Sequence, residues 1–558
     1  MTAFPPRRPL AALARFTRDE GGSLIVFALV LFLLMAMMGG VALDVMKREA
    51  RQTALMNTLD RATLAAAALT QDLDPESVVR DYVNKSGLGV DLQEITVVQS
   101  VNGRSVAAKG VVDSNPLFLH LIGIDKFDAI GGSAAEQRIT NVEIVLVLDV
   151  SGSMSGAKIA NLRTAASEFV QTVLAGDTDN RVSITIVPYN AQVNLGPVLR
   201  AKYNAANQHG VANVNCLELQ STLYGAPGIS RTTSIPMAAF ADVTNGTNQT
   251  TSYVAWNNSS YATMLTSAPF CRNETRNIVR LPSNNVATLQ SQINALQAGG
   301  NTSITLGMKW GVALLDPTAR GMYSELIAAN QIPAYYEGRP YDYTDTEAMK
   351  VVVLMTDGEH VAHNRINDDY KTGTSPIYRS TGDGNYSIRF TTGRPAAAGT
   401  NQYWVPHLCV SNACMTGSNV AEGWRATPWN SGAGVTQQTW QQVWAGQRLS
   451  WVAWQLYARA LGTSSSARST QYNSAINLLS STYAAVNTMN SSLQTSCNQA
   501  KANGVIVYGI AFEAPTNGQQ QISGCASSPA HYFDAQGLEI QTAFRTIANS
   551  ISQLRLTQ

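Results

Sequence analysis

Charged residues are scarce in this sequence, and neither sign of charge dominates. Asp, Glu, Lys and Arg make up 14% of the 558 residues, and the formal net charge is +1. Because such a chain has no basic excess to attract nucleic acid, we expect no nucleic-acid partner. Uncharged polar residues crowd the long loops instead, which is typical of a protein outside the cytoplasm.

The sequence also lacks the common catalytic motifs. The glycine-containing stretch 151–158 has neither the spacing nor the Lys-Ser/Thr pair of a phosphate-binding loop. In residues 152–156, Met154 stands where a serine hydrolase has its nucleophile. His360 and His363 do not have the His-Glu-x-x-His spacing of metalloproteases, and we expect them to be solvated loop residues. We therefore predict a protein that is not an enzyme and has no small-molecule substrate.

No two cysteines have the Cys-x-x-Cys spacing of a zinc or redox site. Six cysteines, an even number, are typical of disulfides formed in an oxidising compartment, although the sequence does not choose among the pairings. Buried free thiols are the alternative. The cysteines fall in three local couples, which are Cys216 with Cys271, Cys409 with Cys414, and Cys497 with Cys525.

Near the N-terminus, residues 21–43 contain no charged side chain. This run is long enough to span a bilayer as a helix. Four arginines within residues 1–20 predict a cytoplasmic N-terminus, with the chain after Asp44 in the periplasm. We therefore expect a single-pass anchor in the inner membrane. A cleaved signal peptide, with a passable cleavage site at residues 40–42, is the alternative.

The helical pattern continues beyond the apolar run, and no proline interrupts residues 23–69. One helix of about 70 Å is therefore expected, with Gly39 and Gly40 as its weak point. Such an apolar helix that emerges as an amphipathic spine resembles the N-terminal segment of pilins. The apolar face of the spine has 4-3-4-3 spacing and consists of Leu55, Leu59, Ala62, Ala66 and Leu69.

Residues 71–140, taken together, are predicted to form a small α+β collar between the anchor region 21–70 and the rest of the chain. Residues 95–101 and 105–112 read as two strands joined by a hairpin turn, and residues 117–124 as a short helix.

From residue 141 to residue 558, apolar strands alternate with amphipathic helices. This alternation predicts an α/β class, a doubly wound parallel sheet, with one of the later helices carrying residues 476–493. Two long insertions, at about 190–280 and 360–450, interrupt the alternation. Four tryptophans in and just after the second insertion share a helical face, which we expect to pack in the core; they are Trp440, Trp444, Trp451 and Trp454.

One apolar run, residues 144–148, leads into a loop rich in oxygen-bearing side chains. The run suits a strand buried on both faces of a parallel sheet. It ends at Asp149, and Ser151 and Ser153 follow at alternate positions. A carboxylate and two hydroxyls at the carboxyl end of a central strand can hold a hard divalent cation.

The pattern Asp-x-Ser-x-Ser resembles the metal-ion-dependent adhesion site, or MIDAS, of von Willebrand factor A domains. In that family a Thr after a Gly pair and an Asp after a later core strand complete the site. The resemblance implies Thr302, with Thr305 a less suitable substitute, and Asp357, which follows the apolar run 351–355.

A MIDAS with two carboxylates and three hydroxyls binds Mg²⁺, or Mn²⁺ or Ca²⁺, and leaves one position for a water or for an acidic side chain of a protein partner. The resemblance therefore implies metal-bridged contact between proteins. A degenerate site, retained only for the fold, is the alternative.

An N-terminal spine followed by an A domain resembles the TadG-like proteins of the tight-adherence (Flp) pilus system. This resemblance implies a membrane-anchored factor in pilus assembly or surface adhesion, whose partner belongs to the pilus or secretion machinery. A structural, pseudopilin-like envelope subunit with a passive A domain is the alternative. The stretches that carry the resemblance are "DEGGSLIVFALVLF", "LDRATLAAAA", "LVLDVSGSM", "GGNTSITLGMKWG", "LMTDGE", "GIAF" and "LRLT".

Overall fold

The chain forms two compact units in the computed structural model. The first consists of Met1–Ile139 with Arg555–Gln558, and the second of Thr140–Leu554. The structure describes residues 23–68, 73–99, 103–138, 141–175, 177, 179–206, 208–241, 252–263, 270–410 and 423–557.

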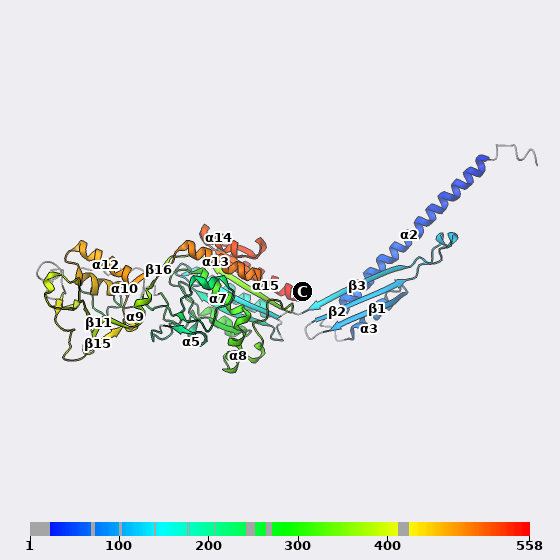
Figure 1. Ribbon diagram of the computed structural model, residues 1–558. Helices are drawn as coiled ribbons and strands as arrows, with labels where there is room; N and C mark the ends of the chain where they lie inside the picture. Colours follow the sequence, from blue (N-terminus) through cyan, green and yellow to red (C-terminus); the bar gives the residue numbers. More distant parts are fainter. Residues whose placement is uncertain are drawn as a thin grey trace, which may run out of the picture. The chain divides into compact units, whose positions relative to one another are not determined.

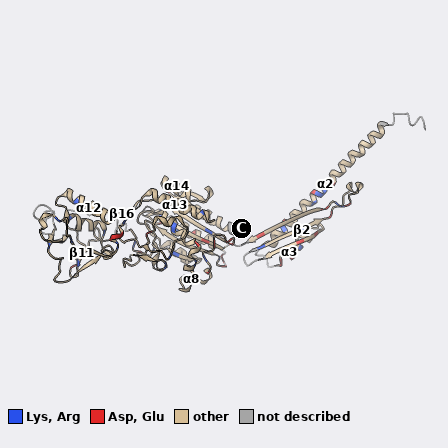
Figure 2. Ribbon diagram, viewed as in Figure 1, with Lys and Arg blue, Asp and Glu red and all other residues tan. Residues whose placement is uncertain are grey.

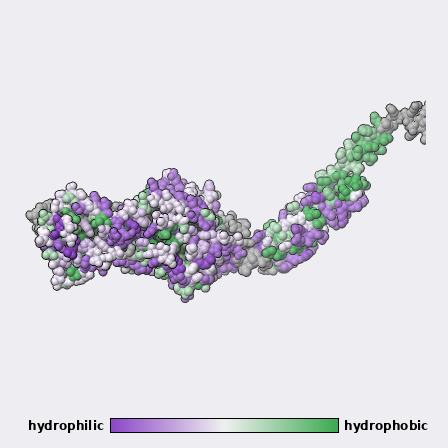
Figure 3. Space-filling view, viewed as in Figure 1, coloured by the Kyte–Doolittle hydropathy of each residue, from purple (hydrophilic) through white to green (hydrophobic). Residues whose placement is uncertain are grey.

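The first unit is built on one long helix, α2 (Ser23–Ala67), as expected from the sequence. Gly39 and Gly40 do not interrupt it. Its N-terminal part is apolar, exposed and free of charge (Figures 2 and 3). Within the described residues, α2 is the one helix long and apolar enough to cross a membrane, a test that a signal sequence would also pass.

The C-terminal half of α2 packs on a three-stranded antiparallel sheet of order β1-β2-β3 (Figure 1). Four of the five residues of the predicted spine, Leu55, Leu59, Ala62 and Ala66, form the core between helix and sheet, and Leu69 lies outside the described residues. The third strand was not predicted, because its Ala-rich, Gly-containing sequence has low strand propensity. The described elements besides α2 are α3 (Pro75–Lys85), β1 (Val90–Gln99), β2 (Gly103–Val112), the short 3₁₀ helix η2 (Leu119–Ile122) and β3 (Ala129–Arg138).

The second unit contains a six-stranded sheet of order β18-β17-β9-β4-β5-β8. All neighbours are parallel except the edge strand β8, which is antiparallel to β5. The two unbroken apolar runs form the central pair, β4 and β9, and are buried over almost their full length. The strands are β4 (Asn141–Asp149), β5 (Val182–Tyr189), β8 (Arg280–Ser283), β9 (Ala348–Thr356), β17 (Ile506–Phe512) and β18 (Tyr532–Ala535).

Helices pack on both faces of this sheet. Successive residues of β4 alternate between two apolar clusters, as side chains of a strand do. The mixed α/β class is therefore confirmed. One cluster contains residues of α7 (Ile304–Leu315), α8 (Arg320–Ala328), α13 (Val486–Ala502) and α14 (Thr516–Cys525), and the other those of α4 (Ala157–Leu174), α6 (Val286–Asn294) and α15 (Glu539–Thr557).

The segment between β5 and β8 contains only short elements and covers the first predicted insertion. The disulfide Cys216–Cys271, whose Cα atoms are 6.1 Å apart, joins two parts of this segment. The elements are α5 (Gly196–Arg200), β6 (Ala205–Ala206), the 3₁₀ turn η4 (Ser221–Gly225) and β7 (Ile235–Pro236).

Between β9 and β17 the chain builds a second apolar core around a sheet of order β14-β13-β12-β11-β15. The four tryptophans are buried as expected, and Trp440, Trp444 and Trp451 belong to this second core. Trp440 and Trp444 lie on one short helix, whereas Trp451 and Trp454 lie on the helical segment that follows it, so the prediction of one shared helical face was wrong. The elements are β11 (Thr374–Ser380), β12 (Tyr386–Arg389), β13 (Tyr403–Trp404), β14 (Trp424–Arg425), β15 (Val435–Thr439), α9 (Trp440–Gly446), α10 (Leu449–Trp451), the π-helix η12 (Val452–Ala458) and α11 (Arg459–Leu461).

The predicted helix over residues 476–493 was wrong. The chain instead forms α12 (Ser465–Leu479), the strand β16 (Ser480–Ala484) and then α13. Ser and Thr at 480–482 favour the extended strand, which pairs with β10 (His363–Ile366).

A second disulfide, Cys497–Cys525, joins α13 to the end of α14, with the Cα atoms 5.1 Å apart. Two of the three predicted cysteine couples are thus confirmed. Cys409 is buried, but Cys414 lies outside the described residues.

Candidate metal centre

Three loops meet at the carboxyl ends of the central strands β4 and β9. The backbone N–H of Gly152, in the 3₁₀ turn η3 (Gly152–Met154), donates to the carbonyl of Gly300 at 2.8 Å. The N–H of Val361 donates to the carbonyl of Thr302 at 3.1 Å. These backbone bonds hold the loop before α7 between the loops that follow β4 and β9.

Asp149 is completely buried at the end of β4. Its Oδ1 accepts a hydrogen bond from the backbone N–H of Ser151 at 2.7 Å, and its Oδ2 accepts one from Thr356 Oγ1 at 2.7 Å. Burial raises the pKa of Asp149 to about 6, and the negative charge of Asp357 acts in the same direction. The carboxylate is therefore fixed in orientation and short of compensating positive charge.

Asp357 follows β9 and lies in the same cluster. Ser153 Oγ donates to Asp357 Oδ1 at 2.7 Å, and the hydroxyl oxygens of Ser151 and Ser153 are 3.0 Å apart. The ammonium group of Lys158, in the first turn of α4, donates to Asp357 Oδ2 at 2.9 Å and lies 3.6 Å from Glu513. A cation of the chain thus partly compensates the charge of the site.

Thr302, rather than Thr305, faces this cluster. A Cβ atom placed on Gly358 would lie 3.6 Å from Thr302 Oγ1 and 3.8 Å from Ser153 Oγ, so both hydroxyls border the same glycine. Thr305 is used elsewhere, because its Oγ1 donates to the carbonyl of Met489 at 3.1 Å. The structure brings the five residues named from the sequence together; they are Asp149, Ser151, Ser153, Thr302 and Asp357.

The donor set fits a hard divalent cation. Two carboxylates and three hydroxyls are oxygen ligands of the kind that Mg²⁺ prefers. No hydrogen bond of Thr302 Oγ1 occurs within the described part of the chain, which leaves this oxygen available as a ligand. The described residues contain no cluster of three or more His, Cys, Asp or Glu side chains that could hold a metal ion. The candidate centre has only two carboxylates, so its remaining ligands must be hydroxyl groups.

Three residues of the centre were not predicted from the sequence. Thr356 and Lys158 bind the two carboxylates, and the hydroxyl of Tyr189, at the end of β5, donates to the carbonyl of Met355 at 2.9 Å beside Asp149. Burial raises the pKa of Tyr189, so it stays a neutral donor. Tyr189 and Thr356 are the last residues of β5 and β9, the two strands that flank β4. This position at the end of a strand is the sequence feature by which they could have been predicted.

The expectation that the histidines are solvated was wrong for His360. This residue is buried, its Nε2 accepts a hydrogen bond from the N–H of Thr305 at 3.0 Å, and its Nδ1 lies 2.7 Å from Asn490 Oδ1. It therefore links the loop after β9 to α7 and α13. The side chain of His363 lies outside the described residues.

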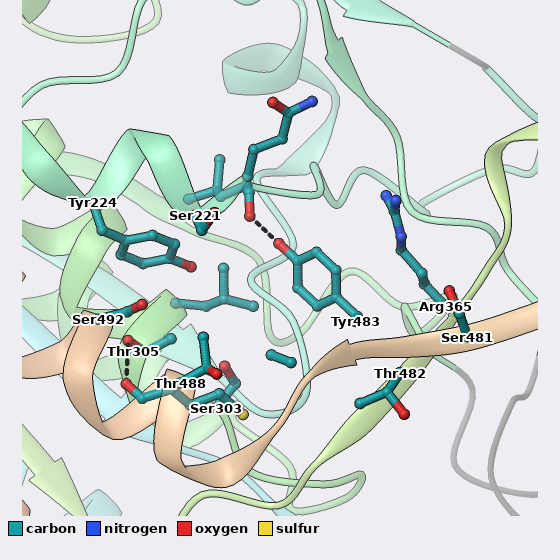
Figure 4. Close-up of a pocket in the computed structure, with 15 residues that line it drawn as sticks. Ser221, Tyr224, Ser303, Thr305, Arg365, Ser481, Thr482, Tyr483, Thr488 and Ser492 are labelled. Carbon is teal, nitrogen blue, oxygen red and sulfur yellow. Dashed lines mark hydrogen bonds between the residues drawn. The ribbon is translucent and has the colours of Figure 1, made fainter.

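A cavity of about 350 Å³ lies at the first turn of α7, where Ser303 and Thr305 line it (Figure 4). Hydroxyl groups line it, including those of Tyr224 and Ser492, between the 3₁₀ turn η4 and α13. Ser303 Oγ is buried there and has no hydrogen-bond partner among the described residues. The cavity contains none of the five candidate metal ligands.

No family model and no curated protein matches this chain. Among solved structures, it is similar to the von Willebrand factor domain of the type V pili tip protein Mfa5 from Porphyromonas gingivalis, at 13% identity and a TM-score of 0.30, over 75% of this chain and 97% of that one. It is also similar to the adhesive tip pilin GBS104 from Group B Streptococcus agalactiae, at 14% identity and a TM-score of 0.31, over 74% and 99% of the two chains.

A further likeness is to the pilus adhesin RrgA from Streptococcus pneumoniae, at 12% identity and a TM-score of 0.28, over 83% of this chain and 49% of that one. The chain therefore spans about half the length of RrgA. The structures similar to this chain thus include proteins of pilus tips, but at these TM-scores the likenesses carry no conclusion about its function.

Proposed function

We propose that this chain is a membrane-anchored, TadG-like protein that binds a partner protein through a divalent cation, in pilus assembly or surface adhesion. The cation is Mg²⁺, or Mn²⁺ or Ca²⁺. The anchor is α2, as a single pass of the inner membrane with the N-terminus in the cytoplasm and the second unit in the periplasm. The protein is not an enzyme.

The observation that carries the proposal is the convergence of five oxygen-bearing side chains from three distant loops. Asp149, Thr302 and Asp357 are far apart in the sequence, yet backbone hydrogen bonds hold their loops together. Such a set fits a bound cation better than a purely structural turn, because Thr302 Oγ1 borders the same glycine as Ser153 Oγ and has no hydrogen-bond partner in the described residues.

The sheet supports the assignment to a von Willebrand A-type domain. Numbered along the chain, its strands lie in the order 3-2-1-4-5-6, the order of doubly wound α/β folds. In such folds ligands bind at the carboxyl ends of the strands, where the order reverses. That reversal lies between β4 and β9. Asp149 is the last residue of β4, and Asp357 directly follows β9.

The chemistry of the centre selects the partner. Two carboxylates cannot fully satisfy a divalent cation that prefers six oxygen ligands. A bound Mg²⁺ would supply a strong positive charge that an Asp or Glu side chain of the partner can complete. Ser151, Ser153 and Thr302 would orient the cation as neutral ligands and leave it electron-poor.

Titration of the purified chain with Mg²⁺ tests the site. Thr302→Val keeps the shape and charge of the residue, and we expect it to weaken Mg²⁺ binding roughly tenfold or more. Thr305→Val is the matched control, because Thr305 lies one helical turn away and bonds Met489 instead. Equal affinity of the two variants, or no binding by the wild type, would refute the proposed centre.

A pull-down from detergent-solubilised membranes tests the partner. We expect pilus or secretion components to co-purify with the wild-type chain in Mg²⁺ and to be lost in EDTA. Asp149→Asn should abolish the capture, whereas Asp342→Asn should not, because Asp342 is exposed and pairs with Arg320. Capture that persists in EDTA would argue against a metal bridge.

The ion pair of Lys158 with Asp357 favours a second candidate function. Because this carboxylate already has a cation, the A domain could be passive, and the chain a structural, pseudopilin-like envelope subunit that acts through α2. A pilus phenotype that requires α2 but survives Asp149→Asn and Asp357→Asn would favour this second function.

A further inference from the structure

The loop between β2 and β3, residues 113–128, has an apolar tip that no other described part of the first unit covers. Leu117 and Leu121 are each 70% exposed, Ile122 is 51% exposed and Ile124 is 41% exposed. Four large aliphatic side chains in eight residues are unusual on a loop in water, and such a patch normally marks an interaction surface. We call residues 117–124 the apolar tip.

The apolar tip is fixed to α2 at the end of the charge-free run. Asp44, the first charged residue after that run, is buried. Its Oδ1 accepts a hydrogen bond from the N–H of Leu117 at 2.9 Å, and its Oδ2 accepts two, from Phe118 at 2.7 Å and Leu119 at 2.9 Å. The tip therefore lies at the level where the apolar part of α2 ends.

Gly40 brings the tip against the helix itself. A Cβ atom at this position would lie 2.2 Å from the ring of Phe118, whereas one at Gly39 would meet nothing within 4 Å. The contact at Gly40 lies one turn before Asp44, inside the charge-free run. The tip thus overlaps the apolar part of α2 rather than beginning beyond it.

The base of the loop is held by cations of the next two turns of α2. Arg48 Nε donates to the carbonyl of Asp128 at 3.2 Å, Lys47 Nζ donates to that of Asn115 at 3.4 Å, and Arg51 donates to that of Asp113. From its N-terminal side, α2 therefore presents first the apolar contact of Gly40 with Phe118, then Asp44, and then the positively charged side chains. That order matches a membrane interface, because Lys and Arg side chains near the end of a membrane-spanning helix reach the level of the headgroups.

We propose that the apolar tip inserts into the leaflet of the bilayer from which α2 emerges, with phospholipid acyl chains as its partner. This inference rests on the proposed anchoring by α2. The tip continues the exposed apolar surface of α2, which at this level includes Leu43. That continuity favours lipid over a second protein as the partner of the tip. The acyl chains of one leaflet can cover the apolar surface of α2 and the apolar tip together, whereas a protein partner would need a new interface.

The insertion is shallow. Nδ1 of His120, in the tip, lies 2.6 Å from Oδ1 of Asp125 just after it, and both side chains are well exposed. A polar pair of this kind is tolerated at the boundary of headgroups and acyl chains but not in the bilayer centre. The inserted loop makes a second attachment beside the helix and fixes the collar sheet against the membrane surface.

Fluorescence of the full-length chain in phosphatidylcholine vesicles tests the insertion. Leu121→Cys, labelled with an environment-sensitive fluorophore, reports the tip, and no free cysteine of the described residues competes for the label. Val98→Cys is the matched control, because Val98 is also apolar and 64% exposed but lies near the opposite end of the sheet, paired with Ser105. Leu31→Cys, in the charge-free run, reports insertion of α2 itself.

With brominated lipids, we expect the labels at Leu31 and Leu121 to lose more than half of their fluorescence and the label at Val98 to keep it. Quenching at Leu31 with Leu121 behaving like Val98 would overturn the insertion of the tip and leave the anchor intact. No quenching at Leu31 would overturn the anchor. A third outcome is a Leu121 label that is shielded from water but not quenched by the brominated lipid. If dilution of the protein in the bilayer then exposes this label to water, the partner of the tip is a second copy of the chain instead. Leu117→Cys repeats the measurement if Leu121→Cys does not fold.

Discussion

The ammonium group of Lys158 lies 2.9 Å from Asp357 Oδ2, so one of the two carboxylates of the candidate metal centre is paired with a cation of the chain itself. The side chain of Lys158 is 23% exposed and that of Asp357 is buried, so solvent screens the pair only in part. A divalent cation must therefore compete with Lys158 for this carboxylate. Once bound, the cation stays close to the positive charge of the Lys158 ammonium group.

We expect Lys158→Met to bind Mg²⁺ about fivefold more tightly than the wild type, because removal of the competing charge is worth about 1 kcal/mol. Calorimetric titration measures the change. Lys202→Met is the control, because Lys202 is similarly exposed and pairs with Glu325 at 3.0 Å, away from the centre. If both variants bind Mg²⁺ equally, Lys158 does not regulate the centre.

The glycine pair in α2 offers a matched test of how the apolar tip is seated. We expect Gly40→Ala to displace Phe118 and to cost about 1–3 kcal/mol through overpacking, whereas Gly39→Ala has free space. Limited trypsin digestion of the chain in vesicles, with cleavage after Lys126 as the readout, measures the loosening. Equal rates for the two variants would show that Phe118 is not held at Gly40.

The disulfide between α13 and α14 should stabilise the second unit. The two cysteines are 28 residues apart, and for a loop of that length restriction of the unfolded chain predicts about 3.5 kcal/mol. We therefore expect Cys497→Ala with Cys525→Ala to lower the midpoint of chemical unfolding, followed by circular dichroism. Reduction of the wild type with dithiothreitol should lower it too, and a midpoint that neither treatment changes would contradict the prediction.

His209 should make stability depend on pH. Burial lowers its pKa to about 4, the charge of Arg200 acts in the same direction, and its Nδ1 accepts a hydrogen bond from the N–H of Val211 at 3.0 Å. Because the folded-state pKa lies below the ordinary value near 6.5, the folded state is favoured above pH 6.5 and loses this advantage as the pH falls towards 4.

The expected loss is about 2 kcal/mol over that interval, after allowance for partial solvent access. Urea unfolding of the wild type and of His209→Gln at pH 7.5 and pH 4.5 measures it, and the wild type should lose more. Equal losses in both proteins would show that another group titrates.

The sequence predicts those features that depend on long, regular patterns. The charge-free run and the 4-3-4-3 spacing predict α2, and the two unbroken apolar runs predict the central strands β4 and β9. Because the carboxyl ends of a parallel pair of strands lie at one edge of the sheet, the sequence alone is enough to place Asp149 near Asp357.

Features set by tertiary contact could not be predicted in this way. Tyr483 continues the helical spacing of Ile476 and Leu479, but it lies on β16, where its hydroxyl donates to the carbonyl of Leu219. Nothing local marks Lys158 as the partner of Asp357, since the two meet only when the fold brings the start of α4 to the loop after β9. His360 is buried only because α7 and α13 approach it from distant parts of the chain.

A buried ion pair joins the two long segments that interrupt the α/β alternation. Glu218, in the first segment, contacts the ammonium group of Lys371 and lies 2.9 Å from Nη1 of Arg365, and both of these cations are in the second segment. Glu218 and Lys371 are almost inaccessible to solvent. Excision of residues 363–480 would strand a carboxylate in the interior without a counter-ion, a defect that typically costs about 3–5 kcal/mol. The second segment therefore cannot be excised without leaving Glu218 unpaired. A shortened chain intended for expression should either keep both segments or replace Glu218 with an uncharged residue.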